Sequence, residues 1–187
     1  MLDAEGAVWV CYSGGEVLRI RDGQLRVFTA ADGLPGGSGC QLTLDGAGQL
    51  WFAQGGCVGV FREGRFCPLA QQYFLRITGA RPSGIWGYRD RHLWKLAEGG
   101  PPVKLSALSA DMPEVVPTAM REDRVGCLWL GTLKAGLIRF DQDGGVTVPL
   151  PQQTILALQE DSEGNLWVDS VGENRPRCRE DVQCDRN

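Results

Sequence analysis

The sequence predicts an all-β protein, a partial β-propeller of about four to five four-stranded antiparallel blades. Tryptophan recurs along the chain at intervals of 42, 35, 43 and 38 residues, by difference of the residue numbers. The repeats are marked by Trp9, Trp51, Trp86, Trp129 and Trp167. The 187 residues include 26 glycines and 10 prolines and few plausible helices. A repeat of about 40 residues, rich in short strands and tight turns, is typical of a propeller blade.

Each repeat places an acidic turn before its tryptophan. Six residues earlier stand Asp3, Asp45, Asp123 and Asp161, and three residues earlier stand Gly6, Gly48, Gly126 and Gly164. The copy at Trp86 lacks the aspartate, and its Gly84 is displaced. An aspartate accepts backbone N–H groups within a turn, and glycine takes positive φ without steric cost. We therefore expect a hairpin that leads into a buried apolar-Trp-apolar strand.

Prolines and glycine-rich segments recur at the same spacing as the tryptophans. Sixteen residues before three of the tryptophans stand Pro35, Pro113 and Pro151, which mark loops that precede a strand. The segment "GGEVLRIRDGQL" from Gly14 matches "GGCVGVFREGRF" from Gly55. These segments supply the remaining strands of a four-stranded unit. Since one blade cannot bury its own faces, we expect the tryptophans to pack blade against blade.

The repeats predict two regions, an incomplete propeller over residues 1–168 and an irregular or disordered tail over residues 169–187. Three repeats are full, and the first and last are partial. After Trp167 the sequence has Asp169 and Ser170 where another repeat has Gly131 and Thr132, and apolar alternation then stops. We expect the chain to be a piece of a larger ring. The sequence leaves open whether it is a natural product or a truncated or frameshifted fragment.

Composition narrows the classes of partner. The net charge of −4 and pI near 5.1 argue against nucleic acid and anionic membranes. The sequence shows no signal peptide and no run of apolar residues long enough to span a bilayer. Seven cysteines form no CxxC pair, and His92 is the single histidine. We therefore predict no metal site and no cofactor, and interpret most cysteines as small buried apolar residues.

The segments "LALQEDSEGNLWV" and "AMREDRVGCLWLGTLKAGLIRFD" resemble the two-component regulator propeller repeat. In that family, propellers form the sensory, usually periplasmic part of hybrid sensor histidine kinases. The resemblance implies signal input from a small molecule, often carbohydrate-derived. It also implies a parent sensor kinase, with the rest of the propeller and the kinase as partners, on the periplasmic side of a bacterial inner membrane. This chain contains no kinase motif, so we do not expect it to be an enzyme.

The sequence offers few candidate site residues. The aspartates recur once per blade and so do not converge, which favours turn capping over a catalytic or Ca²⁺ site. The five tryptophans in register fit core packing better than ligand stacking. Trp94 and His92, in the irregular "DRHLWKL" segment, are weak candidates for ligand binding. A repeat whose sequence has decayed because no function constrains it would be equally irregular. No catalytic, cofactor-binding or metal-binding residue is predicted.

We predict a ligand-sensing propeller module of a two-component signalling protein. A propeller scaffold that binds protein partners is an alternative that the sequence does not separate from it. A third hypothesis is a lyase similar to streptogramin B lyase, whose blades also carry segments like "GQLWFAQ". Those enzymes need convergent histidine and glutamate with a metal, and one histidine argues against this. A fourth hypothesis is a fragment without independent function.

Overall fold

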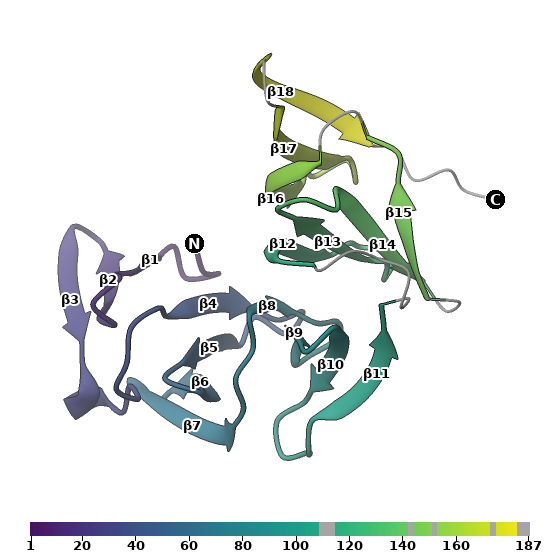
Figure 1. Cartoon of the computed structure of the whole chain (residues 1–187). Coiled ribbons are helices and arrows are strands. Elements are labelled where there is room, and N and C mark those ends of the chain that lie inside the picture. The colour runs from purple at the N-terminus through teal and green to yellow at the C-terminus, as the bar shows by residue number, and fades with distance from the viewer. Residues whose placement is uncertain (109–114, 142–143, 151–152, 173–174, 183–187) are drawn as a thin grey trace. The chain divides into compact units, whose positions relative to one another are not determined.

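The computed structural model describes residues 1–108, 115–141, 144–150, 153–172 and 175–182 (Figure 1). Over these residues the chain forms antiparallel β-sheets and one short 3₁₀ turn, Ala30–Asp32, and no α-helix. Strands that follow one another in the chain pair side by side in every sheet. Consecutive antiparallel pairing needs only short hairpin turns, which the Asp-Gly and Gly-Gly segments of the sequence supply.

Three of the sheets have four strands. The second sheet contains β4 (Gln41–Leu44), β5 (Leu50–Gln54), β6 (Cys57–Arg62) and β7 (Arg65–Gln71). The third contains β8 (Arg76–Gly79), β9 (Ile85–Arg89), β10 (His92–Leu96) and β11 (Val103–Ala107). The fourth contains β12 (Pro117–Glu122), β13 (Leu128–Thr132), β14 (Leu137–Asp141) and β15 (Gly144–Val148). These three sheets are the three full repeats.

The first and last sheets have three strands in the described residues. The first contains β1 (Val8–Cys11), β2 (Val17–Arg21) and β3 (Gln24–Phe28). The fifth contains β16 (Thr154–Glu160), β17 (Leu166–Gly172) and β18 (Arg175–Val182). The prediction of an all-β partial propeller with three full and two partial repeats is confirmed. The corner prolines Pro113 and Pro151 lie outside the described residues.

The chain divides into two compact units. The first unit comprises residues 1–89 and 94–104, and the second comprises residues 90–93 and 105–187. The first and second sheets belong to the first unit, and the fourth and fifth sheets to the second. Each unit has its own buried clusters between neighbouring sheets.

In the first unit the tryptophans fill the space between sheets. Trp9 of the first sheet stacks on Phe28 at a centroid distance of 5.6 Å and meets Phe61 of the second sheet edge-on at 4.9 Å. Trp51 of the second sheet joins a cluster that includes Ile77 and Ile85 of the third. Both indoles are almost fully buried. The predicted packing of blade against blade is confirmed for these two residues.

The second unit repeats this arrangement. Trp129 on β13 packs with Ile155 on β16 and Val168 on β17, and it is buried to the same degree as Trp51. All five residues of β5 and all five of β13 are buried, as predicted for strands covered on both faces. Trp86 and Trp167 are only half-buried. One indole buries about 150–250 Å², so each buried copy is a major part of its interface.

The C-terminal region differs from the sequence-based expectation. We predicted an irregular tail from residue 169, but β17 continues to Gly172 and β18 pairs with it over Arg175–Val182. Backbone hydrogen bonds to the edge of β17 require no apolar alternation, which is why the pattern of side chains did not reveal this strand. Residues 173–174 and 183–187 lie outside the described part of the chain.

Candidate functional site

The acidic turns are structural, and each one holds its tryptophan. Asp123 accepts the backbone N–H groups of Val125 and Cys127 at Oδ1, at 3.0 and 2.8 Å. Its other oxygen, Oδ2, accepts the indole Nε1–H of Trp129 at 2.8 Å. The same indole bond joins Trp9 to Asp3 at 2.7 Å, Trp51 to Asp45 at 2.9 Å and Trp167 to Asp161 at 2.8 Å. Turn capping was predicted, whereas the bond to the indole was not.

One of these carboxylates has a strongly altered acidity. The Trp167 indole N–H and the Asn165 amide hold the pKa of Asp161 well below its usual range, with further help from two backbone N–H groups of the turn. A carboxylate that accepts several hydrogen bonds is favoured in its charged form. These contacts all lie within one hairpin, so the shift indicates a structural role.

The third repeat closes its turn differently. Ala80 occupies the position of the missing aspartate and is fully buried, and Trp86 Nε1 is buried without a hydrogen-bond partner. The backbone N–H of Gly84 instead donates to Asp45 Oδ2 of the second repeat at 2.8 Å. The turn of the third repeat is thus held by the carboxylate of the second repeat.

The residue three positions after each register tryptophan distinguishes the repeats. In the fourth repeat this residue is Thr132, which closes its own turn: Oγ1 donates to Gly136 O and accepts from Ala135 N, both at 2.8 Å. In the second and third repeats the equivalent residues are Gln54 and Arg89. Their side chains reach away from their own turns, and both contribute to one site in the first compact unit.

Gln54 connects three loops. Its Nε2 donates to the carbonyl oxygens of Gly15, Pro35 and Gly37 at 2.8, 2.9 and 3.1 Å. This fixes the orientation of the amide, because a flipped group would set its oxygen against three carbonyls. Gln54 is 5% exposed, and its Oε1 is buried without a partner.

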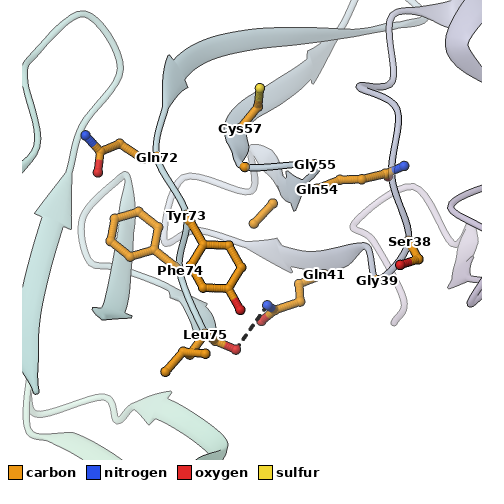
Figure 2. A pocket seen from close by; sticks show the side chains of 12 residues that line it. Ser38, Gly39, Gln41, Gln54, Gly55, Cys57, Gln72, Tyr73, Phe74 and Leu75 are labelled. Carbon is orange, nitrogen blue, oxygen red and sulfur yellow. Dashed lines mark hydrogen bonds between the residues drawn. The ribbon is translucent and has the colours of Figure 1, made fainter. Parts of the chain in front are cut away.

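A pocket of about 270 Å³ opens beside Gln54 (Figure 2). Three segments line it, namely the approach to β4, the β5–β6 hairpin and the β7–β8 connection. The lining residues are Ser38, Gly39, Gln41, Ala53, Gln54, Gly55, Gly56, Cys57, Gln72, Tyr73, Phe74 and Leu75. The lining contains no carboxylate, imidazole, ammonium or guanidinium group. Sequence reasoning missed this pocket, since its walls come from loops that the repeat does not conserve.

Two backbone features shape the pocket walls. Gly55 has φ +59°, and a Cβ there would lie 2.1 Å from the carbonyl oxygen of Gly36, so the hairpin fits against that loop only with glycine. Gln41 holds the β7–β8 connection: its Nε2 donates to Leu75 O at 3.2 Å (Figure 2), and its Oε1 accepts from Ile77 N at 3.1 Å. The Gly55–Gly36 approach and the Gln41 bonds to Leu75 and Ile77 therefore position the walls of the pocket.

Arg89 reaches the pocket through Gln72. Its guanidinium Nη1 donates to Gln72 Oε1 at 2.7 Å, and its Cζ lies 4.7 Å from the ring centroid of Trp94. A guanidinium over an indole face is a favourable cation–π arrangement. Trp94, a candidate ligand residue from the sequence, is thus a platform for Arg89 and does not line this pocket.

His92, the other sequence candidate, lies elsewhere on β10. Its Nδ1 lies 2.5 Å from the carbonyl oxygen of Asp90, a local contact two residues away. It is not among the residues that line the pocket. The two sequence candidates, Trp94 and His92, therefore do not line this pocket, and their role in ligand binding stays a prediction. The deviation of the third position after Trp51 and Trp86 from Thr132 was the signal that could have found the pocket.

The groups still available in the pocket are uncharged. Because Gln72 Oε1 accepts from Arg89, its Nε2 remains to donate. Ser38 and Tyr73 add hydroxyl groups that can donate and accept, whereas Gln54 Oε1 is buried out of reach of solvent. The pocket can therefore bind a neutral molecule that both donates and accepts hydrogen bonds, with the ring of Tyr73 as an apolar surface. Within the described ranges, no three His, Cys, Asp or Glu side chains gather to hold a metal ion.

Residues 149–172 match the model of the two component regulator propeller family. The match covers the fifth repeat, and it confirms the resemblance recognised in the sequence. No curated protein matches the chain. No helix in the described part of the chain has the length and hydrophobicity needed to cross a membrane.

Solved structures share the fold. A catalytically inactive virginiamycin B lyase from Staphylococcus aureus aligns with a TM-score of 0.71 at 15% identity, over 96% of this chain and 67% of that one. The extracellular domain assigned to a hybrid two component system of Bacteroides thetaiotaomicron aligns with a TM-score of 0.58 at 13% identity, over 98% and 33%. The chain spans about two thirds of the lyase and one third of the sensor domain. Identities this low show the fold alone.

Proposed function

We propose that this chain is a ligand-sensing propeller module of a two-component signalling protein, and that the pocket beside Gln54 receives the ligand. The observation that carries the proposal is the pocket itself, in which the Gln72 amide, oriented by Arg89, lies with the hydroxyl groups of Ser38 and Tyr73. The repeat match and the likeness to an extracellular two-component domain support the signalling context.

The chemistry of the lining favours binding over catalysis. Amides and hydroxyls with a flanking aromatic ring recognise neutral ligands by shape and hydrogen bonds. A polyhydroxylated molecule such as a sugar supplies the donors and acceptors that this set requires, and its apolar ring face suits Tyr73. The likeness to lyases extends to the fold, and nothing in this pocket adds to that hypothesis.

The parent protein in this proposal is a sensor histidine kinase with the propeller on the periplasmic side of the inner membrane. Ligand binding would fix the β5–β6 hairpin against the β7–β8 connection, since the pocket lies between them. The ligand would thus restrict the motion of these two loops relative to each other, and the rest of a parent propeller can transmit that change.

The proposal is tested by binding of neutral sugars to the whole chain. We would screen a mixture of neutral mono- and disaccharides by saturation-transfer difference NMR and measure the affinity of each hit by calorimetry. We expect Tyr73→Ala to weaken binding at least about tenfold, which is the loss of about 1.4 kcal/mol expected for an aromatic contact. Tyr12→Ala is the matched control, because Tyr12 is 52% exposed against 57% for Tyr73 and does not line the pocket. No transfer from any sugar, or equal affinity in both variants, would contradict the proposal.

A further inference from the structure

Two cysteines from different sheets meet beside the pocket. Cys11 is the last residue of β1, and Cys40 directly precedes β4. Both are partly buried and pack against the same cluster of apolar residues around Trp9 and Phe52. Each thiol shifts the pKa of the other, so the two sulfur atoms lie within interaction distance. The two cysteines are 29 positions apart in the sequence, so the contact belongs to the packing of the first sheet against the second.

The contact shifts the pKa values of the two thiols in opposite directions. The Cys40 thiol lowers the pKa of Cys11 below its usual value, even though burial opposes this. The interaction with Cys11, together with burial, raises the pKa of Cys40. Cys11 is therefore the thiol that ionises first. The thiolate is the nucleophile in disulfide exchange, so Cys11 is the residue that would attack.

We propose that Cys11 and Cys40 form a disulfide that joins the first and second sheets next to the ligand pocket. The oxidant is an organic disulfide such as oxidised glutathione. The Cys11 thiolate attacks one of its sulfurs, forms a mixed disulfide and releases one glutathione thiolate. Cys40 then loses its proton and attacks Cys11 Sγ, which forms the Cys11–Cys40 bond and releases the second glutathione. Two protein thiols are oxidised by two electrons, the oxidant's S–S bond is reduced to two thiols, and the two protons end on glutathione.

The position of Cys40 gives the bond a consequence for the pocket. Gly39 and Gln41, on either side of Cys40, both line the cavity. A bond to Cys11 would hold this wall against the first sheet, close to the turn whose Gly15 carbonyl accepts from Gln54. The periplasmic location proposed above is an oxidising setting in which such bonds persist. The disulfide itself does not depend on the identity of the ligand.

Peptide mapping tests this directly. The chain would be equilibrated in buffer with roughly a tenfold excess of oxidised over reduced glutathione, alkylated under denaturing conditions and cleaved before aspartate. Cleavage at Asp3, Asp22, Asp32, Asp45 and Asp90 separates the cysteines by peptide. Residues 3–21 then carry Cys11, residues 32–44 carry Cys40, and residues 45–89 carry Cys57 and Cys67.

We expect a linked pair of the peptides 3–21 and 32–44 in the wild-type chain. Cys67→Ser is the matched control, because Cys67 is also partly buried but belongs to the cluster around Trp51, and the link should persist in it. Cys11→Ser should lose the link, and Cys40 should then be found alkylated or bound to glutathione. Recovery of Cys11 and Cys40 as separately alkylated peptides in the wild-type chain, or a link from either to residues 45–89, would overturn the proposal.

Discussion

The indole N–H of Trp129 donates to Asp123 Oδ2 at 2.8 Å, while Asp123 Oδ1 accepts two backbone N–H groups of the turn between them. One carboxylate thus fixes both the hairpin and the orientation of the side chain that fills the interface with the next sheet. Three other repeats contain the same pair with the same spacing of six residues. The bond therefore connects the local turn to the packing of the blades.

The first prediction concerns Asp123→Asn. An amide has only one acceptor oxygen, so it cannot serve the turn and the indole together. We expect the variant to lose about 1.5–3 kcal/mol of unfolding free energy, the usual value of a hydrogen bond to a charged group. Urea unfolding followed by circular dichroism measures this. Asp22→Asn is the control, since the Asp22 side chain is 89% exposed, and it should change stability by less than about 0.5 kcal/mol.

The indole resonances give a second prediction. In the ¹H–¹⁵N spectrum, the Nε1–H signals of the four tryptophans that donate to an aspartate should be shifted downfield by the carboxylate. The signals of Trp86 and Trp94 should lie upfield of them, because the indole N–H groups of these two residues lack an acceptor. Assignment by single Trp→Phe variants identifies each signal. A Trp86 signal as far downfield as that of Trp129 would show that the third repeat has an acceptor that the structure lacks.

Acid titration should reveal the carboxylate of the fifth repeat. The indole of Trp167 lowers the pKa of Asp161 in the folded chain, relative to the ordinary value of 3.8. A lowered folded-state pKa gives stability that is present above the unfolded-state pKa and is lost as the pH falls through the folded-state pKa. We expect thermal melting of the wild-type chain to fall more steeply below about pH 4 than that of Asp161→Asn. Parallel curves for the two proteins would contradict this.

The β5–β6 hairpin allows a sharp comparison of two adjacent glycines. Gly55 and Gly56 both have positive φ, so alanine costs about 1–2 kcal/mol at either position. A Cβ at Gly56 meets nothing within 4 Å, whereas one at Gly55 meets the Gly36 carbonyl oxygen at 2.1 Å. We expect Gly55→Ala to destabilise the chain by about 1–3 kcal/mol more than Gly56→Ala, the usual cost of overpacking. Equal melting temperatures would show that the hairpin does not press against this loop.

Ion pairing between the fourth and fifth repeats should be measurable. Arg124 donates from Nε to Glu160 Oε1 at 2.8 Å and from its other nitrogens to the carbonyls of Asp161 and Ser162. The Glu160 side chain is 4% exposed, so Arg124→Ala leaves a buried carboxylate with fewer donors. Because the arginine is itself 42% exposed, we expect a loss of about 1.5–3 kcal/mol, below that for fully buried pairs. The exposed pair of Arg62 with Glu98 is the control, and Arg62→Ala should cost less than about 1 kcal/mol.

The fold could be predicted from the sequence because its determinants are periodic. The spacing of Trp51 and Trp129, with aspartate and glycine at fixed positions before them, specifies turn, strand and interface in each unit. The pocket could not be predicted in this way, since Gln54, Gln72 and Tyr73 occupy positions that differ between repeats. The strand after Gly172 was missed for another reason, because it is held by backbone pairing to β17 and not by an apolar pattern.

The most direct measurement is a double-mutant cycle on Asp123 and Trp129, using Asp123→Ala, Trp129→Phe and the double variant in urea unfolding. If the carboxylate holds the indole in the interface, the two changes will show a coupling energy of about 1.5–3 kcal/mol, since either one alone breaks the same charged hydrogen bond. Strictly additive losses, with a coupling below about 0.3 kcal/mol, would show that aspartate and tryptophan act independently and that the repeated pair does not link turn to blade packing.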